Sequence, residues 1–211
     1  MKFYPAYLDL RDRPCLVIGG GAVAERKALS LLEAGAEVTI VSPSLTPKLQ
    51  ELSVSGKITH HRKTFDEQDL VGEALVVAAT SSHDVNVFAA RACKKRHILV
   101  NVAAPPEEST FIVPSLVERG ELLIAVSTTG VSPALAKRIR QELERQYGTE
   151  YELFLEKFAT IRARVLHEVT DERTRRKIFQ AIADSDAIEL FRMGRLHEAE
   201  ARMLELAGLS R

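Results

Sequence analysis

The stretch from residue 14 to 43, PCLVIGGGAVAERKALSLLEAGAEVTIVSP, constrains the fold more than any other part of the chain. It contains an apolar run, a glycine loop, a helical pattern and a second apolar run, in that order. Gly19, Gly21 and Ala24 form the spacing G-x-G-x-x-A directly after the first run. In this context the spacing predicts a dinucleotide-binding βαβ unit. The alternative is a tight strand-to-helix turn that binds nothing.

Each residue of this loop has an expected physical role. Gly19 allows the tight turn, Gly21 lets the backbone approach a pyrophosphate, and Ala24 permits close packing of the helix on the sheet. Ala22 and Val23 supply backbone N–H donors at the helix N-terminus, where the aligned peptide dipoles favour phosphate. We therefore expect these five residues to bind the cofactor.

The end of the second apolar run bears on which dinucleotide is bound. Ser42 stands where such enzymes often carry an acidic residue for the ribose or a basic residue for a 2′-phosphate. A hydroxyl can still bond to ribose, and the absence of Arg or Lys at this strand end favours NAD over NADP. Pro43 and Ser44 are expected to flank the adenosine, or alternatively to form only a turn.

Short β-rich runs alternate with helical patterns between about residues 15 and 114. The runs are CLVIGG, EVTIVS, KITHHR, ALVVAAT and ILVNVA, and helical spacing occupies 22–34 and 84–95. This alternation predicts βαβ units and a parallel sheet. Residues 1–113 are therefore expected to form a Rossmann-like α/β domain that binds NAD.

Polar segments follow the last two of these runs. The carboxyl ends of parallel strands converge on the ligand crevice of an open α/β sheet. Thr80, Ser81 and Asn101 are therefore candidates for the pocket. The alternative is that these loops only form turns and helix caps, which Ser82 and Asp84 are suited to do.

The pattern changes after residue 114. ELLIAVST predicts one more strand, and Ser132 and Pro133 then fit the cap and first turn of a helix. From residue 150 the strand signals end, and apolar residues recur at helical spacing on a charged chain. We expect a small α/β dimerisation module over 114–149, a helical C-terminal domain over 150–211, and a homodimer.

Charge and apolar content exclude several classes of protein. The 29 basic and 29 acidic residues cancel, so no net field attracts nucleic acid or an anionic membrane. No apolar run approaches the roughly 18 residues of a membrane span, and MKFYPAYLDLRDR carries no secretion-signal core. Cys15 and Cys93 have neither disulfide nor metal-ligand spacing, which favours a reducing cytoplasm.

Several segments together match the pattern of one family. They are LRDRPCLVIGGGAVAERKALSLLEAGAEVTIVSP, FDEQDL, VVAAT, NVAAPPEESTFIVPS and AVSTTGVSPALAKRIRQELE. In them the chain resembles the precorrin-2 dehydrogenase/sirohydrochlorin ferrochelatase family of sirohaem biosynthesis, the N-terminal unit of sirohaem synthases. The resemblance implies a Rossmann domain, a dimerisation module and a helical tail. It also implies NAD⁺-dependent oxidation of precorrin-2 to sirohydrochlorin, and in some members Fe²⁺ insertion.

The substrate implied by this resemblance is a large polycarboxylate. Ser132 and the helix start that follows it can bind a carboxylate, with Lys137, Arg138 or Arg140 nearby. The alternative is that these bases form a solvated helix face.

The chain departs from the family at Ala104. Relatives have approximately NVVD where this chain has NVAA, and the resemblance assigns the aspartate an acid/base role in both reactions. Alanine cannot exchange a proton. The explanations are an engineered substitution, a natural member that has lost an activity, or another group that takes over. Glu107 and Glu108 are candidates for that group, although both also fit exposed loop charges.

No pattern predicts a resident metal. His60 and His61 lie in a predicted strand, where alternation sends them to opposite faces, and His83 alone has a location near the crevice. We therefore expect a cytoplasmic, homodimeric, NAD-dependent oxidoreductase. The alternatives are a catalytically weak tetrapyrrole-binding carrier, which Ala104 favours, and a dinucleotide-sensing regulatory module.

Overall fold

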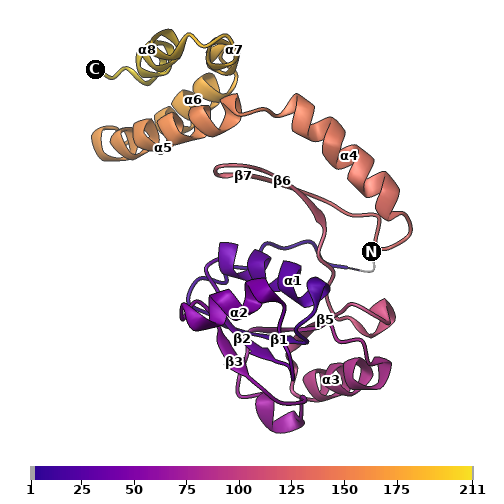
Figure 1. Cartoon of the computed structure of the whole chain (residues 1–211). Helices are drawn as coiled ribbons and strands as arrows, with labels where there is room; N and C mark the ends of the chain where they lie inside the picture. Colours follow the sequence, from indigo (N-terminus) through magenta and orange to yellow (C-terminus); the bar gives the residue numbers. More distant parts are fainter. Residues whose placement is uncertain (1–2, 211) are drawn as a thin grey trace. The chain divides into compact units, whose positions relative to one another are not determined.

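The computed structural model describes residues 3–210 (Figure 1). The chain divides into two units, Met1–Val113 and Pro114–Arg211. Two apolar clusters form the core of the first unit, and a third forms the core of the second. The three-domain division expected from the sequence stays a prediction.

The first unit is built on a five-stranded parallel sheet with the order β3-β2-β1-β4-β5. The chain moves outward from β1 to β3, returns to β4 on the other side of β1, and continues to β5. The strand order therefore reverses between β1 and β4, where open α/β sheets bind their ligands. The strands are β1 (Pro14–Ile18), β2 (Glu37–Val41), β3 (Thr59–His61), β4 (Leu75–Ala78) and β5 (Leu99–Val102).

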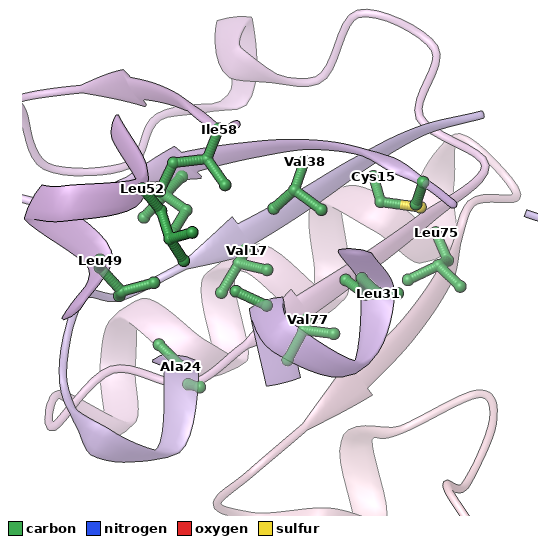
Figure 2. Packing of buried hydrophobic residues seen from close by; sticks show 14 residues of the cluster. Cys15, Val17, Ala24, Leu31, Val38, Leu49, Leu52, Ile58, Leu75 and Val77 are labelled. Atoms are coloured by element: carbon green, nitrogen blue, oxygen red, sulfur yellow. The ribbon is translucent and has the colours of Figure 1, made fainter. Parts of the chain in front are cut away.

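Alternating side chains of β1 enter opposite cores. Cys15 and Val17 pack with α1 (Ala22–Glu33) and α2 (Pro47–Val54), as Figure 2 shows. Leu16 and Ile18 pack with α3 (His83–Lys95) on the other face. Because helices cover both faces, the central strands must be apolar along their whole length. The Rossmann-like α/β class predicted from the sequence is confirmed.

The helices of this unit begin where the chain offers a cap. The Ser82 hydroxyl accepts from the Val85 N–H at 3.4 Å at the start of α3. Helix α2 was not predicted from the sequence, although Thr46 caps it by accepting from the Leu49 N–H at 3.3 Å. Two short 3-10 turns, η1 (Glu67–Asp69) and η2 (Pro106–Glu108), lie in the loops.

The second unit begins with an antiparallel hairpin of β6 (Ser115–Arg119) and β7 (Leu122–Val126). Only β7 was predicted. Helix α4 (Pro133–Gln146) packs against the hairpin, and Arg119 Nη2 donates to the Glu144 carbonyl at 3.2 Å. Ser132 caps α4 as expected, because its hydroxyl accepts from the Leu135 N–H at 3.3 Å.

The rest of this unit is helical, as predicted. Its core joins Phe154, Ile161 and Val165 of α5 to Ile182 of α6 and Met203 of α8. Within residues 3–210 no helix has both the length and the apolar character needed to cross a membrane. The helices are α5 (Glu150–Glu168), α6 (Glu172–Ala183), α7 (Ala187–Arg192) and α8 (Leu196–Ala207).

Candidate functional site

Two glycines of the loop after β1 are required by the protein itself. Gly19 has φ +120°, and a Cβ there would lie 2.4 Å from the Ala79 carbonyl oxygen. A Cβ at Gly20 would lie 1.9 Å from the Ser44 carbonyl oxygen. Neither position can accept a side chain unless the neighbouring backbone moves, so internal packing explains both glycines.

Gly21 has no such internal reason to be glycine. Its φ of −88° and ψ of −175° are extended backbone, and a Cβ there would meet nothing within 4 Å. It is the N-cap of α1, and no side chain caps the helix. The first-turn N–H groups of Ala22 and Val23 therefore face a site without a capping group. Open space beside such donors is what a pyrophosphate needs, so the residues present fit a dinucleotide.

The helix that follows lies close to the sheet. Ala24 is fully buried in the cluster formed with β1, β2 and β4, and Figure 2 shows it within this core. A larger side chain at this position would push the start of α1 away from the strands. The small residue thus fixes where the first-turn N–H groups lie.

The structure turns the Ser42 side chain inward. Its exposed fraction is 5%, and its hydroxyl donates to the Ser44 carbonyl at 2.7 Å. The His60 ring holds the backbone from the other side, with Nε2 2.9 Å from the Ser42 carbonyl oxygen. The hydroxyl proton is therefore used within the loop, and only lone pairs are left for a ribose. Pro43 and Ser44 are exposed beside it.

The loop after β4 is organised by Asn86, a residue that was not predicted from the sequence. Asn86 of α3 is 1% exposed, and its Oδ1 accepts from the Thr80 N–H at 3.0 Å and lies 2.8 Å from the Thr80 hydroxyl. Its Nδ2 donates to the carbonyls of Thr80 at 3.1 Å and Ala104 at 2.9 Å. A signal was present in the sequence, because position 86 belongs to the apolar stripe of α3 that continues at Ala89, Ala90 and Cys93.

The other pocket candidates differ in what they leave free. The Thr80 hydroxyl is engaged with Asn86 and with the Ser82 carbonyl at 2.9 Å, which is the turn-forming alternative. Ser81 is exposed, and its hydroxyl has no hydrogen-bond partner in the described part of the chain. Asn101 is half-buried and donates from Nδ2 to the Phe111 carbonyl at 3.1 Å, which leaves its Oδ1 available.

Ala104 presents an exposed methyl group just beyond the end of β5. Downstream, Glu108 is 2.6 Å from the Lys94 ammonium, whose hydrogen bond lowers the pKa of that carboxyl. Glu108 therefore carries a paired charge and is poorly suited to exchange protons near neutral pH. Glu107 and His83, the first residue of α3, are exposed.

The bases expected to bind substrate lie on α4. Arg138 forms an ion pair with Glu142 at 2.9 Å, which raises the pKa of the guanidinium. Arg140 is paired with Glu144 in the same way, one helical turn apart. Both pairs favour the solvated-face interpretation for these two arginines. Lys137 is exposed and has no ion-pair partner among residues 3–210.

Residues 3–210 hold no group of three or more His, Cys, Asp or Glu side chains arranged to coordinate a metal ion. Cys15 and Cys93 are free and buried on opposite faces of the sheet. Burial raises the pKa of the Cys93 thiol to about 11 and also raises that of Cys15. Both thiols are therefore protonated and inert at neutral pH.

Known proteins similar to this chain share its two-part pattern. Residues 6–115 match the family described as "Putative NAD(P)-binding", and residues 119–146 match the one described as "Sirohaem biosynthesis protein central". "Siroheme synthase" of Methylococcus capsulatus is 38% identical over 207 residues, which cover 98% of this chain and 44% of that protein. "Siroheme synthase" of Thioalkalivibrio sulfidiphilus is also 38% identical over 207 residues, covering 98% and 42%. The chain spans less than half the length of these relatives.

A solved structure described as "SirC, precorrin-2 dehydrogenase" is similar in fold. It is 28% identical with a TM-score of 0.82, and the match covers 96% of this chain and 100% of that one. The first family match alone includes more than half of the chain. The chain therefore belongs to the NAD(P)-binding family of sirohaem biosynthesis, the precorrin-2 dehydrogenase/sirohydrochlorin ferrochelatase family that its sequence resembles.

Proposed function

We propose that this chain oxidises precorrin-2 to sirohydrochlorin with NAD⁺. The observation that carries the proposal is Gly21, which leaves open space beside an uncapped helix start in a relative of siroheme synthases and of a precorrin-2 dehydrogenase. Bound NAD⁺ supplies the acceptor for a hydride, and the substrate loses one proton with it. The chain has to bind the pyrophosphate, orient the reactants and pass on that proton.

Positioning is the main task of the first unit. The N–H groups of Ala22 and Val23 would bind the pyrophosphate, as the family fingerprint requires. The loops after β4 and β5 would form the wall of the reaction site, where Ser81 and the Asn101 Oδ1 are free to contact the cofactor. Thr80 would act there through its backbone and the hydrogen bonds that shape the loop.

The choice of NAD over NADP is supported by the chemistry after β2. Ser42, Pro43 and Ser44 bring no cation to the place where a 2′-phosphate would lie. The Ser42 hydroxyl keeps lone pairs that can accept from a ribose hydroxyl. A Kd for NAD⁺ at least about tenfold below that for NADP⁺ is expected, since an unpaired phosphate would lose a charge-assisted hydrogen bond.

The proton step is where this chain departs from its family. Ala104 cannot accept a proton, and Glu108 is held by Lys94. Water, Glu107 or His83 would have to take the proton, so oxidation is expected to be slow. Insertion of Fe²⁺ as a substrate makes the same demand, because two pyrrole N–H protons must leave the macrocycle. We expect this second reaction to be weak for the same reason.

Binding of the substrate carboxylates is assigned to the start of α4. The Ser132 N–H donates to Thr128 Oγ1 at 3.0 Å and the hydroxyl accepts from the Leu135 N–H, so only the hydroxyl proton is left for a carboxylate. Lys137 is the base whose charge is unpaired, so it is the first choice for a carboxylate. Arg138 would contribute only by releasing Glu142.

The proposed partner is a second copy of the chain. A two-stranded hairpin is only marginally stable in water by itself, so it needs further packing on its faces. Leu116, Val131 and Leu135 are exposed by 42%, 86% and 45% in this unit, and a homodimer would cover apolar surface of this kind. The two buried thiols suit a cytoplasmic location. Light scattering should give a dimer, and Leu116→Lys should give a monomer; a wild-type monomer at micromolar concentration would contradict the assignment.

The test of the function is to incubate the chain with precorrin-2 and NAD⁺ and to follow sirohydrochlorin absorbance. Ala104→Asp is expected to raise turnover by about 10²-fold or more, because it restores a general base. The Kd for NAD⁺ should stay within about twofold, since backbone donors hold the pyrophosphate. Ala103→Asp, which places the same charge one residue earlier on an exposed position, is the matched control.

The outcomes separate the alternatives. A folded Ala104→Asp variant that is no faster than the parent shows that position 104 has no acid/base role here. If no variant oxidises precorrin-2 but the chain binds sirohydrochlorin, it is a tetrapyrrole carrier, the alternative that Ala104 itself favours. Binding of NAD⁺ alone would identify a dinucleotide-sensing module.

A further inference from the structure

We propose that Asn86 is a positioning residue, one that holds the loop after β4 and the loop carrying residue 104 at a fixed distance from each other. The inference rests on the proposed function, because it concerns where residue 104 lies relative to the cofactor. Asn86 contacts neither reactant in this scheme. It acts through the backbones of Thr80 and Ala104, which its side-chain amide joins.

The two loops leave the sheet side by side. β4 pairs with β5 up to Ala78 and Val102, and the Ala103 N–H donates to the Ala78 carbonyl at 2.9 Å. Beyond that bond the strand ladder ends, so nothing in the sheet fixes the spacing of residues 80 and 104. Asn86 continues the link across this gap by hydrogen-bonding to both backbones.

Packing alone does not account for an amide at position 86. The neighbouring residues of the same helix stripe are Ala89, Ala90 and Cys93, all fully buried. An apolar side chain would continue that stripe without having to bury a polar amide, which costs free energy unless every group is paired. In Asn86 both ends of the amide are paired, and all of the bonds go to the two loops.

The consequence for function follows from the steep dependence of rate on geometry. A displacement of about 1 Å in the reacting groups can lower a rate by about 10²-fold. Residue 104 lies two residues beyond the end of β5, so loss of the amide would let its backbone drift from the β4 loop. The effect should fall on kcat once a base stands at position 104, and much less on NAD⁺ binding, because α1 supplies the phosphate donors.

The experiment uses the full chain with Ala104→Asp as the parent, and adds Asn86→Leu or Asn86→Asp. Leucine keeps the branched shape but removes every hydrogen bond. Aspartate keeps an acceptor for the Thr80 N–H, and donates to a loop carbonyl only when its carboxyl is protonated. Ser82→Ala is the matched control, since it removes the α3 cap without touching these bonds to the two loops.

Asn86→Leu is expected to lower kcat by about 10- to 100-fold while the Kd for NAD⁺ changes less than about threefold. The kcat of Asn86→Asp, compared with that of the parent at the same pH, should rise towards the parental value as the pH falls. A mere packing role would not produce this profile. Hydrogen exchange of the Ala103 amide, measured without ligand, should accelerate at least about tenfold in Asn86→Leu and stay unchanged in Ser82→Ala.

The exchange measurement keeps the two proposals separable. If the parent oxidises no precorrin-2, the proposed function fails, while faster exchange at Ala103 still supports the link that Asn86 makes between the two loops. If Asn86→Leu folds with parental exchange at Ala103, that link is wrong whatever the activity. A kcat within twofold of the parent, or a loss equal to that of Ser82→Ala, overturns the positioning role. Should Asn86→Leu fail to fold, the pH profile of Asn86→Asp decides.

Discussion

Replacing Gly21 by aspartate is expected to stabilise the fold and to weaken dinucleotide binding at the same time. The backbone at Gly21 is extended, and a Cβ there meets nothing within 4 Å, so the new side chain enters without strain. Removing a glycine at a compatible conformation gains about 0.4–1 kcal/mol, and aspartate gains a few tenths more as an N-cap over glycine. The free energy of unfolding should rise by about 1 kcal/mol, which raises Tm by about 2–4 °C for a chain of this size.

The same carboxylate would occupy the donors that the pyrophosphate needs. A hydrogen bond to a charged group contributes about 1.5–3 kcal/mol, and the two anions also repel each other. Loss of about 2 kcal/mol corresponds to a Kd for NAD⁺ raised by about 30-fold. Titration calorimetry gives the Kd, and thermal unfolding followed by circular dichroism gives Tm on the same sample.

Gly20→Ala is the matched control in the same loop. Its Cβ would lie 1.9 Å from the Ser44 carbonyl oxygen and 2.7 Å from the Ser42 hydroxyl oxygen, so the loop must shift. Such overpacking typically costs about 1–3 kcal/mol, and Tm should fall. The reasoning is refuted if Gly21→Asp destabilises the protein as much as Gly20→Ala, or if it binds NAD⁺ within about twofold of wild type.

Three further predictions concern the rest of the molecule. Lys94→Gln should raise the pKa of Glu108, so the acid unfolding of this variant should differ from that of wild type. The lowered pKa stabilises the wild-type fold above the ordinary value of 4.5, and this stability is lost as the pH falls through the folded pKa. Cys15 and Cys93 should resist a thiol reagent at pH 8 until the chain unfolds; fast labelling would contradict their burial. Ile182→Ala, in the fully buried helical core, should lower the free energy of unfolding by about 2–5 kcal/mol in a denaturant titration, and a loss under about 1 kcal/mol would be inconsistent with that core.

Local patterns in the sequence determined the architecture of this protein. Strands covered on both faces must be apolar throughout, and a helix covering them repeats every three to four residues, so β1 to β5, α1 and α3 were readable from neighbouring residues alone. Ser132 before Pro133 marked the start of α4 for the same reason. β6 escaped because SLVER carries charge at two of its five positions and is a strand only beside β7.

Only the tertiary structure decided which polar groups of the site are free. The Ser42 and Thr80 hydroxyls were candidates to bind the cofactor, yet in the folded chain both donate their protons to groups of the protein itself. Asn86 Nδ2 donates to the carbonyl of Ala104, which is 18 residues away in the sequence. The two atoms come within 2.9 Å only when α3 packs beside β5. Hydrogen bonding is short-ranged in space, whereas the sequence records only distance along the chain. For that reason the spacing of the loop gives Gly21 a role and Gly20 none, and only the folded loop shows that Gly20 is packed and Gly21 open.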